Sequence, residues 1–331
     1  MKKKKETEWF KGEATDIKID GKAVDVPEYQ KKKISLTHVY HTGANIGYYH
    51  RVLDIMQNKY PINCTLVRLD DYVKQGNPST DVLSYQTFPD EHHKGKFNPN
   101  LVKLGDKFFQ QFTGHKILFD ANDSGEVDSF SRFKNSKELP RIKSFPSKWF
   151  MEHYNVFLSA SFAATDYRTW PDELERTIKI SCKFGGYSYF HKIRELVVEQ
   201  LNTFFPGKVD FKRVEGRVAY TNELKRTLIA IGAPGWGQYS ATHHCALRVG
   251  TLLFAHEAIN DVKWLPHADL IDGEDFVSYN LYNFKFKLQR LLDSPGEIER
   301  IRKNGREKIK MGYSIEKSAD AFYKYLSGVL K

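Results

Sequence analysis

The sequence predicts an α/β fold with two doubly wound parallel sheets, one in each half of the chain. Short apolar runs alternate with amphipathic segments through most of the 331 residues, which is the pattern of strands and helices in a parallel sheet. In each half, one apolar run leads into a glycine loop and then into helical sequence. The length is sufficient for two domains, each with a core of its own.

Four segments follow from this pattern. We expect a basic polar tail or small hairpin at residues 1–33 and a first domain at 34–170. A second domain is expected at 171–312, and a last helix at 313–331 is expected to return to the first domain.

The expected elements follow the chain in order. The first domain has strand patterns at 34–40, 64–69, 82–85, 116–119 and 156–160, helical patterns to about 57 and at 99–112, and a βα unit at 141–153. The second has strand patterns at 178–183, 209–214, 229–231 and 251–255, and helical patterns at 191–204 and 222–226. Ser294-Pro-Gly-Glu297 has the residues of a capping box with Pro at the first helical position, and Ser314 begins the last helix.

The most informative segment is 229–253, which reads as a strand, a glycine turn, a short helix and another strand. Gly232, Gly235 and Gly237 allow a tight turn and a close approach of backbone to a ligand. Ser240 is a suitable helix N-cap, and Gly250 is a suitable helix stop. Backbone N–H groups and the helix dipole make such a turn favourable for phosphate. The glycines alone do not exclude an ordinary βα turn without a ligand.

Together with a later segment, this turn resembles the C-terminal domain of GT-B glycosyltransferases of the CgeB-like or group 1-like kind. The residues that carry the resemblance are Gly235, Gly237, Ser240, Gly250-Thr-Leu-Leu253 and Asp272-Gly-Glu-Asp-Phe-Val-Ser-Tyr279. The resemblance covers residues 218–328 well and the first half loosely. It implies two Rossmann-like domains that face each other across a cleft. It also implies a nucleotide-sugar donor as co-substrate, with a UDP-sugar favoured, and no metal or other cofactor.

Two positions depart from the family pattern. Thr242 and Cys245 stand where the family usually has an Arg and a ribose-binding Glu. Glu257 and Glu274 are the nearby acids that we expect to replace that Glu in donor binding. An inactive relative of the family is the alternative.

The resemblance also implies a basic residue beside the donor diphosphate. Lys183, before Gly185 and at the end of a predicted strand, is one candidate, and Arg213 is another. Fixed positive charge is needed there because negative charge builds on the leaving phosphate. The alternative for Lys183 is an ordinary surface residue.

The first glycine loop is the candidate acceptor site. It contains Gly43, Asn45, Gly47, Tyr48 and Arg51, and it follows the first strand, at the edge where open α/β sheets bind ligands. It is similar to a loop of some phage and archaeal glycosyltransferases. The alternative is a helix start with the tyrosines in the core.

An acidic run after the strand at 116–119 is the candidate catalytic site. It holds Asp120, Asp123, Glu126 and Asp128, and such clustered acids are costly unless they are solvated, paired or functional. An inverting transferase needs a carboxylate to deprotonate the acceptor hydroxyl. We therefore expect Asp120 or Asp123 to be the base, with a solvated turn as the alternative.

The formal net charge of +10 bears on the partner. Residues 1–33 hold ten Lys against seven acids, so about +7 belongs to the rest of the chain. A basic surface favours a polyanionic partner. A hydroxymethylated base in DNA is therefore one acceptor, and a glycan or lipid-linked acceptor is another. A non-catalytic nucleic-acid-binding protein on a decayed transferase fold is the rival of a different class.

Cysteine usage and hydropathy bear on the compartment. Cys64, Cys182 and Cys245 are far apart and form no metal knuckle or disulfide pattern, which suits a reducing compartment. No apolar run approaches the roughly 18–20 residues of a membrane span, and no signal peptide is expected. We therefore expect a cytoplasmic protein, in the host cytoplasm if it is viral.

Overall fold

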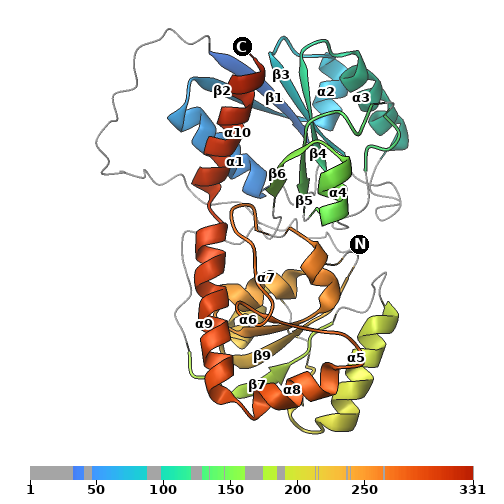
Figure 1. Ribbon diagram of the computed structural model, residues 1–331. Coiled ribbons are helices and arrows are strands. Elements are labelled where there is room, and N and C mark those ends of the chain that lie inside the picture. The colour runs from blue at the N-terminus through green and yellow to red at the C-terminus, as the bar shows by residue number, and fades with distance from the viewer. Residues whose placement is uncertain are drawn as a thin grey trace, which may run out of the picture. The chain divides into compact units, whose positions relative to one another are not determined.

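The computed structural model describes residues 33–40, 47–87, 98–120, 129–133, 135–144, 146–160, 174–184, 191–212, 214, 216–235, 238, 240–263 and 265–330. Its two parallel sheets with flanking helices confirm the predicted fold class (Figure 1). The predicted tail, apart from Lys33, lies outside the described residues.

The first sheet has the strand order β2-β1-β3-β4-β5-β6, and its neighbouring strands are parallel. The strands are β1 (Ile34–Tyr40), β2 (Ile62–Arg68), β3 (Val82–Thr87), β4 (His115–Asp120), β5 (Arg141–Ser144) and β6 (Val156–Ala160). The helices of this part are α1 (Gly47–Lys59), α2 (Leu69–Gln75), α3 (Pro99–Gln111), α4 (Lys148–His153) and α10 (Ile315–Val329).

Helices cover both faces of the first sheet. Met56 of α1 and Phe322 of α10 pack on one face with Leu36 of β1. Tyr72 of α2 and Phe109 of α3 belong to the core of the other face. Because β1 and β3 are neighbours and their helices lie on opposite faces, the topological switch point of this sheet lies between them.

The second sheet has the order β11-β10-β9-β7-β8 and is also parallel. Its strands are β7 (Ile178–Ser181), β8 (Val209–Asp210), β9 (Thr227–Gly232), β10 (Leu252–His256) and β11 (Val277–Tyr279). Its helices are α5 (His191–Phe204), α6 (Arg217–Lys225), α7 (Ala241–Arg248), the 3-10 helix η1 (Glu257–Asp261), α8 (Phe284–Leu292) and α9 (Pro295–Gly312).

The switch point of the second sheet lies between β7 and β9. Val197 of α5 packs with Ile231 of β9 in one core, whereas Leu247 of α7 packs with Ala230 of β9 in the other. The helices after β7 and β9 therefore cover opposite faces. Open α/β sheets bind ligands where neighbouring strands diverge in this way.

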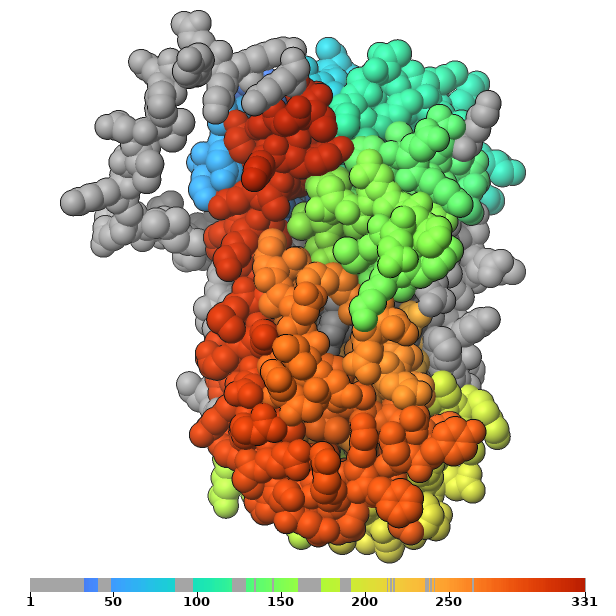
Figure 2. All heavy atoms as spheres, in the orientation of Figure 1, coloured from blue at the N-terminus to red at the C-terminus, as the bar shows by residue number. Residues whose placement is uncertain are grey.

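The last helix, α10, packs against α1. Asp320 accepts hydrogen bonds from Lys59 Nζ at 2.7 Å and from the Tyr60 hydroxyl at 2.6 Å. The rings of Tyr60 and Tyr323 stack with their centroids 3.9 Å apart. In the space-filling view the surface of α10, in red, adjoins that of α1, in blue (Figure 2).

The sequence predicts some ends of helices and strands correctly and others incorrectly. Ser240 stands directly before α7, and Gly250 has a φ of 70° just beyond it, so both predicted ends are confirmed. The predicted capping box at Ser294 is wrong, because its side chain makes no cap hydrogen bond, although α9 does begin at Pro295. α6 begins at Arg217, five residues before the predicted start, and β8 ends at Asp210.

Candidate functional site

The glycine turn lies at the carboxyl edge of the second sheet, directly after β9. A Cβ on Gly232 would lie 2.9 Å from Nε2 of His243, and a Cβ on Gly235 would lie 3.0 Å from Nη2 of Arg194. Both positions therefore exclude a side chain while those neighbours keep their places. Gly237 lies outside the described residues.

His243 fixes the start of α7, the helix that follows the turn. The backbone N–H of Ser240 donates to Nδ1 of His243 at 2.9 Å. Burial lowers the pKa of His243 to about 4, and the charge of Arg194 contributes in the same direction. The imidazole is therefore neutral at pH 7 and accepts at Nδ1, which fixes its tautomer.

Arg194 brings a positive charge to this turn from α5. Its Nε donates to the carbonyl oxygen of Pro234 at 2.7 Å, and its guanidinium lies 5.3 Å from the ring centre of Phe184. The side chain thus crosses the switch point between β7 and β9. Burial lowers the pKa of Arg194 from its ordinary value. No motif in the sequence distinguishes Arg194, although it lies in the first turn of the helix after Gly185.

Lys183 also lies at the carboxyl edge, but two carboxylates already surround its ammonium. Its Nζ lies 2.8 Å from Asp210 Oδ1 and 3.3 Å from Glu223 Oε1, and it donates to the carbonyl of Lys212. Its charge is therefore balanced within the protein. Gly185 and Arg213, the other predicted diphosphate contacts, lie outside the described residues.

The two predicted acids lie at opposite edges of the second sheet. Glu257 follows β10 at the carboxyl edge, where its Oε2 accepts from Asn280 Nδ2 at 3.1 Å. Asn280 follows β11 at the same edge. Glu274 precedes β11 and therefore lies at the amino edge, away from the glycine turn.

The two departures from the family pattern both lie on α7. The Thr242 hydroxyl is 2.9 Å from the hydroxyl of Tyr220 on α6. Cys245 is buried in an apolar core, so position 245 offers no polar group to a ligand.

Asp120 lies at the carboxyl end of β4 and is completely buried. It accepts from Ser129 Oγ at 2.8 Å, and its carboxylate lies 3.3 Å from Lys143 Nζ and 3.9 Å from Arg141 Nη1. Both cations are also fully buried, on β5. Two buried cations and a hydroxyl group thus surround this carboxylate. Its role as a base stays a prediction, and Asp123 lies outside the described residues.

The predicted acceptor loop is described only at its end. Gly43 and Asn45 lie outside the described residues, Gly47 and Tyr48 begin α1, and Arg51 is half-buried in that helix. The neighbouring Tyr49 is 1% exposed, which agrees with the core alternative for that residue.

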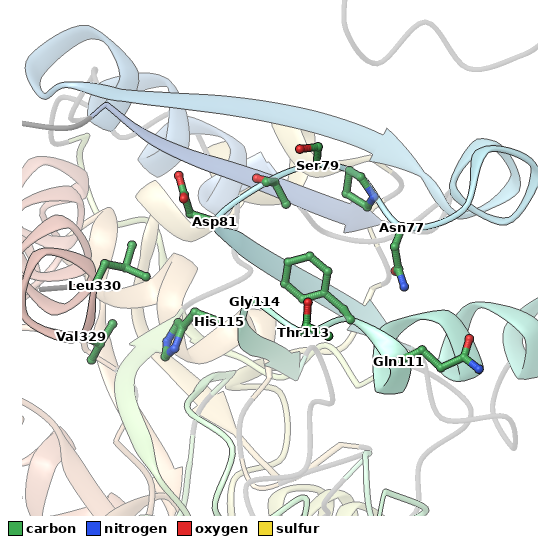
Figure 3. A pocket seen from close by; sticks show the side chains of 12 residues that line it. Asn77, Ser79, Asp81, Gln111, Thr113, Gly114, His115, Val329 and Leu330 are labelled. Atoms are coloured by element: carbon green, nitrogen blue, oxygen red, sulfur yellow. The ribbon is translucent and has the colours of Figure 1, made fainter.

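A cavity of about 850 Å³ lies at the amino edge of the first sheet, away from all these residues. Three segments line it: the loop before β3, the loop before β4, and the end of α10 (Figure 3). Its lining includes Asp81, Thr113, His115 and Leu330. Because ligands of open α/β sheets bind at the carboxyl edge, this cavity is not the site that the sequence predicts.

Two features are absent from the described part of the chain. No group of three His, Cys, Asp or Glu residues there is placed to hold a metal ion. Among the same residues, no helix combines the length and the apolar character that crossing a membrane requires.

Comparison with known proteins gives matches to solved structures. No family model and no curated protein sequence matches the chain. Sucrose-phosphate synthase from Thermosynechococcus elongatus is similar at a TM-score of 0.54 and 10% identity, with 89% of this chain and 100% of that chain covered. An alpha-glucosyltransferase in complex with UDP-glucose and DNA containing an abasic site is similar at a TM-score of 0.52 and 9% identity. The match covers 90% of this chain and 100% of that chain. HepE from Anabaena in complex with UDP-glucose is similar at a TM-score of 0.52 and 8% identity, and the match covers 89% of this chain and 100% of that chain.

Proposed function

Because the chain has the GT-B fold of these structures, we propose that it is a glycosyltransferase. The reaction is transfer of a sugar from a nucleotide-sugar donor to a hydroxyl group. The observation that carries the proposal is the position of Arg194 beside the Gly232–Gly235 turn, at the switch point of the second sheet. A glycine-containing turn, a helix start and a positive charge together favour a bound diphosphate.

In this proposal the turn and the start of α7 bind the donor diphosphate through backbone N–H groups. When the bond between the sugar and the diphosphate breaks, negative charge develops on the leaving phosphate. Arg194 stabilises that charge, and removal of one such donor typically costs about 10²–10³ in kcat. Lys183 contributes at longer range, because its charge is shared with Asp210 and Glu223.

We assign the nucleoside part of the donor to the edge beside Glu257. A carboxylate accepts hydrogen bonds from ribose hydroxyls, and Asn280 holds Glu257 at the carboxyl edge. UDP is the favoured nucleotide, because two similar structures contain UDP-glucose. For an inverting reaction the base is an acid of the 120–128 run. Asp123 is favoured over Asp120, whose carboxylate is paired with Lys143.

The charge of the chain favours DNA as one acceptor class. The formal net charge is +10, and one similar structure is a glucosyltransferase bound to DNA. Binding to DNA should weaken steeply as salt rises, because phosphate contacts release counterions. Removal of residues 1–33 should weaken it only in part. No binding at low salt would exclude DNA and favour a glycan or lipid-linked acceptor.

Nucleotide binding is the experiment that tests the proposal. Thermal denaturation in the presence of UDP, GDP, ADP or UDP-glucose should show a clear rise in Tm with one nucleotide and its sugar. UDP is expected to be that nucleotide. If none of them changes the Tm, the transferase proposal fails and the non-catalytic alternative stands.

A further inference from the structure

A second group of polar side chains lies at the carboxyl end of β1 and β3, on the face that α1 covers. His38 of β1 is the register partner of Ser84 of β3, and Gln86 follows two residues later on the same strand face. Tyr49 and His50 approach from the first turn of α1. The ring centres of His38 and His50 are 6.0 Å apart. This is the switch point of the first sheet, where a doubly wound fold binds ligands.

The hydrogen bonds of this group are incomplete. Ser84 Oγ is bonded by His38 Nδ1 at 3.1 Å and by the Tyr49 hydroxyl at 3.0 Å. Four buried atoms make no hydrogen bond of normal geometry to the described residues: Nε2 of His38, Nε2 of His50, and both Oε1 and Nε2 of Gln86. The Gln86 amide is nevertheless close enough to His38 to raise its pKa, against the larger effect of burial. His38 and Gln86 are at most 1% exposed. Buried polar atoms are normally satisfied, so four such atoms on three neighbouring residues indicate a partner that the described residues do not supply.

The chemistry of the group indicates what that partner is. Burial, with a smaller contribution from nearby His50, holds the pKa of His38 well below its ordinary value. Burial also lowers the pKa of His50 to about 4. Both rings are neutral at pH 7, and Gln86 is an amide, so the unsatisfied atoms carry no charge for an ion. A neutral imidazole and an amide offer both donors and acceptors, which matches the dual character of a hydroxyl group.

Aromatic rings surround these polar atoms. The Phe119 ring lies 5.6 Å from His38, and the Tyr40 ring lies 5.2 Å from His50. Apolar walls with a few convergent polar groups are typical of small-molecule sites. His50 is half-buried, so the group reaches solvent on its side.

We propose that His38, His50 and Gln86 form a binding site for an uncharged, hydroxyl-bearing ligand. The role of this site rests on the proposed function, under which the ligand is the acceptor and the site holds one of its hydroxyl groups. The site is separate from the donor turn, which lies on the other sheet. The acceptor is accordingly a neutral polyol or a hydroxymethyl group at the point of contact.

The test uses the full chain, with histidine labelled for NMR and methyl α-D-glucopyranoside as the neutral probe. Titration should move the His38 and His50 side-chain signals, whereas inorganic phosphate should leave them in place. Gln86→Leu should lower the affinity for the glucoside by about tenfold or more, because the variant cannot form the two buried hydrogen bonds of the amide with the ligand. Gln110→Leu, at an exposed position of α3, is the matched control and should bind normally.

Stability separates a binding role from a structural role. Gln86→Leu removes two unsatisfied buried atoms, so the Tm should stay the same or rise. A lower Tm with unchanged probe binding would make Gln86 a structural residue and overturn the site. Phosphate that moves the His38 and His50 signals as far as the glucoside does would also overturn the site. So would signals that stay in place up to the highest soluble concentration of the glucoside. If the probe binds but no nucleotide changes the Tm, the site stands and the transferase proposal alone fails.

Discussion

Arg194 donates a hydrogen bond from Nε to the carbonyl oxygen of Pro234 at 2.7 Å, and so joins the first turn of α5 to the turn after β9. The bond links segments that lie on either side of the switch point in the second sheet. The Nη2 atom of the same side chain lies 3.0 Å from the place that a Cβ on Gly235 would take. The bond to Pro234 thus helps to hold the guanidinium group beside the glycine turn.

Substitution of Arg194 is the first test of the donor site. Arg194→Ala should reduce kcat by about 10²–10³, because the leaving diphosphate loses a charged donor in the transition state. Lys192→Ala is the control: it lies on the same helix, but its side chain is 80% exposed. Steady-state kinetics with UDP-glucose measures both variants. Equal rates for the two would remove Arg194 from the mechanism.

Gly235 tests how closely the turn approaches Arg194. Gly235→Val places a Cβ about 3.0 Å from Nη2 and branches there, so the guanidinium must move. We expect donor affinity to fall by about tenfold or more, as for a lost charge-assisted hydrogen bond. Gly328→Val adds the same side chain where a Cβ meets nothing within 4 Å. Calorimetric titration with UDP compares the affinities of the two variants. An unchanged affinity in Gly235→Val would contradict the placement of the donor diphosphate at the glycine turn.

The pairing of Asp120 predicts a loss of stability on neutralisation. Asp120→Asn leaves the buried Lys143 and Arg141 without their shared carboxylate. Breaking a buried ion pair typically costs about 3–5 kcal/mol, so urea unfolding should show a loss of this order. A stable Asp120→Asn protein with turnover reduced about 10²–10⁴-fold would instead indicate a general base.

His243 predicts a pH dependence of stability. Its folded pKa is about 4, below the ordinary 6.5, so the unfolded chain binds a proton more readily. The stability that it contributes is complete above pH 6.5 and is lost as pH falls toward about 4. The loss is on the order of 3 kcal/mol, from 1.36 kcal/mol per pKa unit. The free energy of unfolding, measured with urea at several pH values in this range, should change less with pH in His243→Asn than in the unsubstituted protein. An equal change with pH in both proteins would contradict the assignment.

Two glycines of α9 give a matched pair for the fold. A Cβ on Gly305 would overlap the carbonyl oxygen of Asp275, so Gly305→Ala must displace the loop before β11. We expect it to cost about 1–3 kcal/mol, as for overpacking. Gly296→Ala has nothing within 4 Å of its Cβ and should be neutral or slightly stabilising. Thermal denaturation of both variants checks the difference.

Local features of the chain were predictable from sequence, and features that depend on distant segments were not. The turn, Ser240 and Gly250 lie within one βαβ unit, so glycine and capping preferences define them. Arg194 reaches a turn about 40 residues further on, and only the strand order shows that the two meet. Glu274 was grouped with Glu257 because both are near the turn in sequence. Its position before a strand, not after one, places it at the other edge.

The acidic run shows the same division. The sequence places Asp120 correctly at the end of a buried strand. Its partners Lys143 and Arg141 come from the next strand of the sheet, and a buried lysine in a strand carries no sequence signal that distinguishes it from an exposed one. The unsatisfied group at His38 and Gln86 was missed for a related reason, since each lies in an apolar strand pattern.

The position of α10 has a consequence for synthesis of the chain. Phe322 and Leu326 complete the core over α1, where the Phe322 ring lies 5.9 Å from that of Tyr49. These residues leave the ribosome only after the whole second sheet. The face of the first sheet that holds Tyr49 and Met56 therefore stays incompletely covered until α10 has been synthesised, so the first sheet reaches its final stability only after the second has been made.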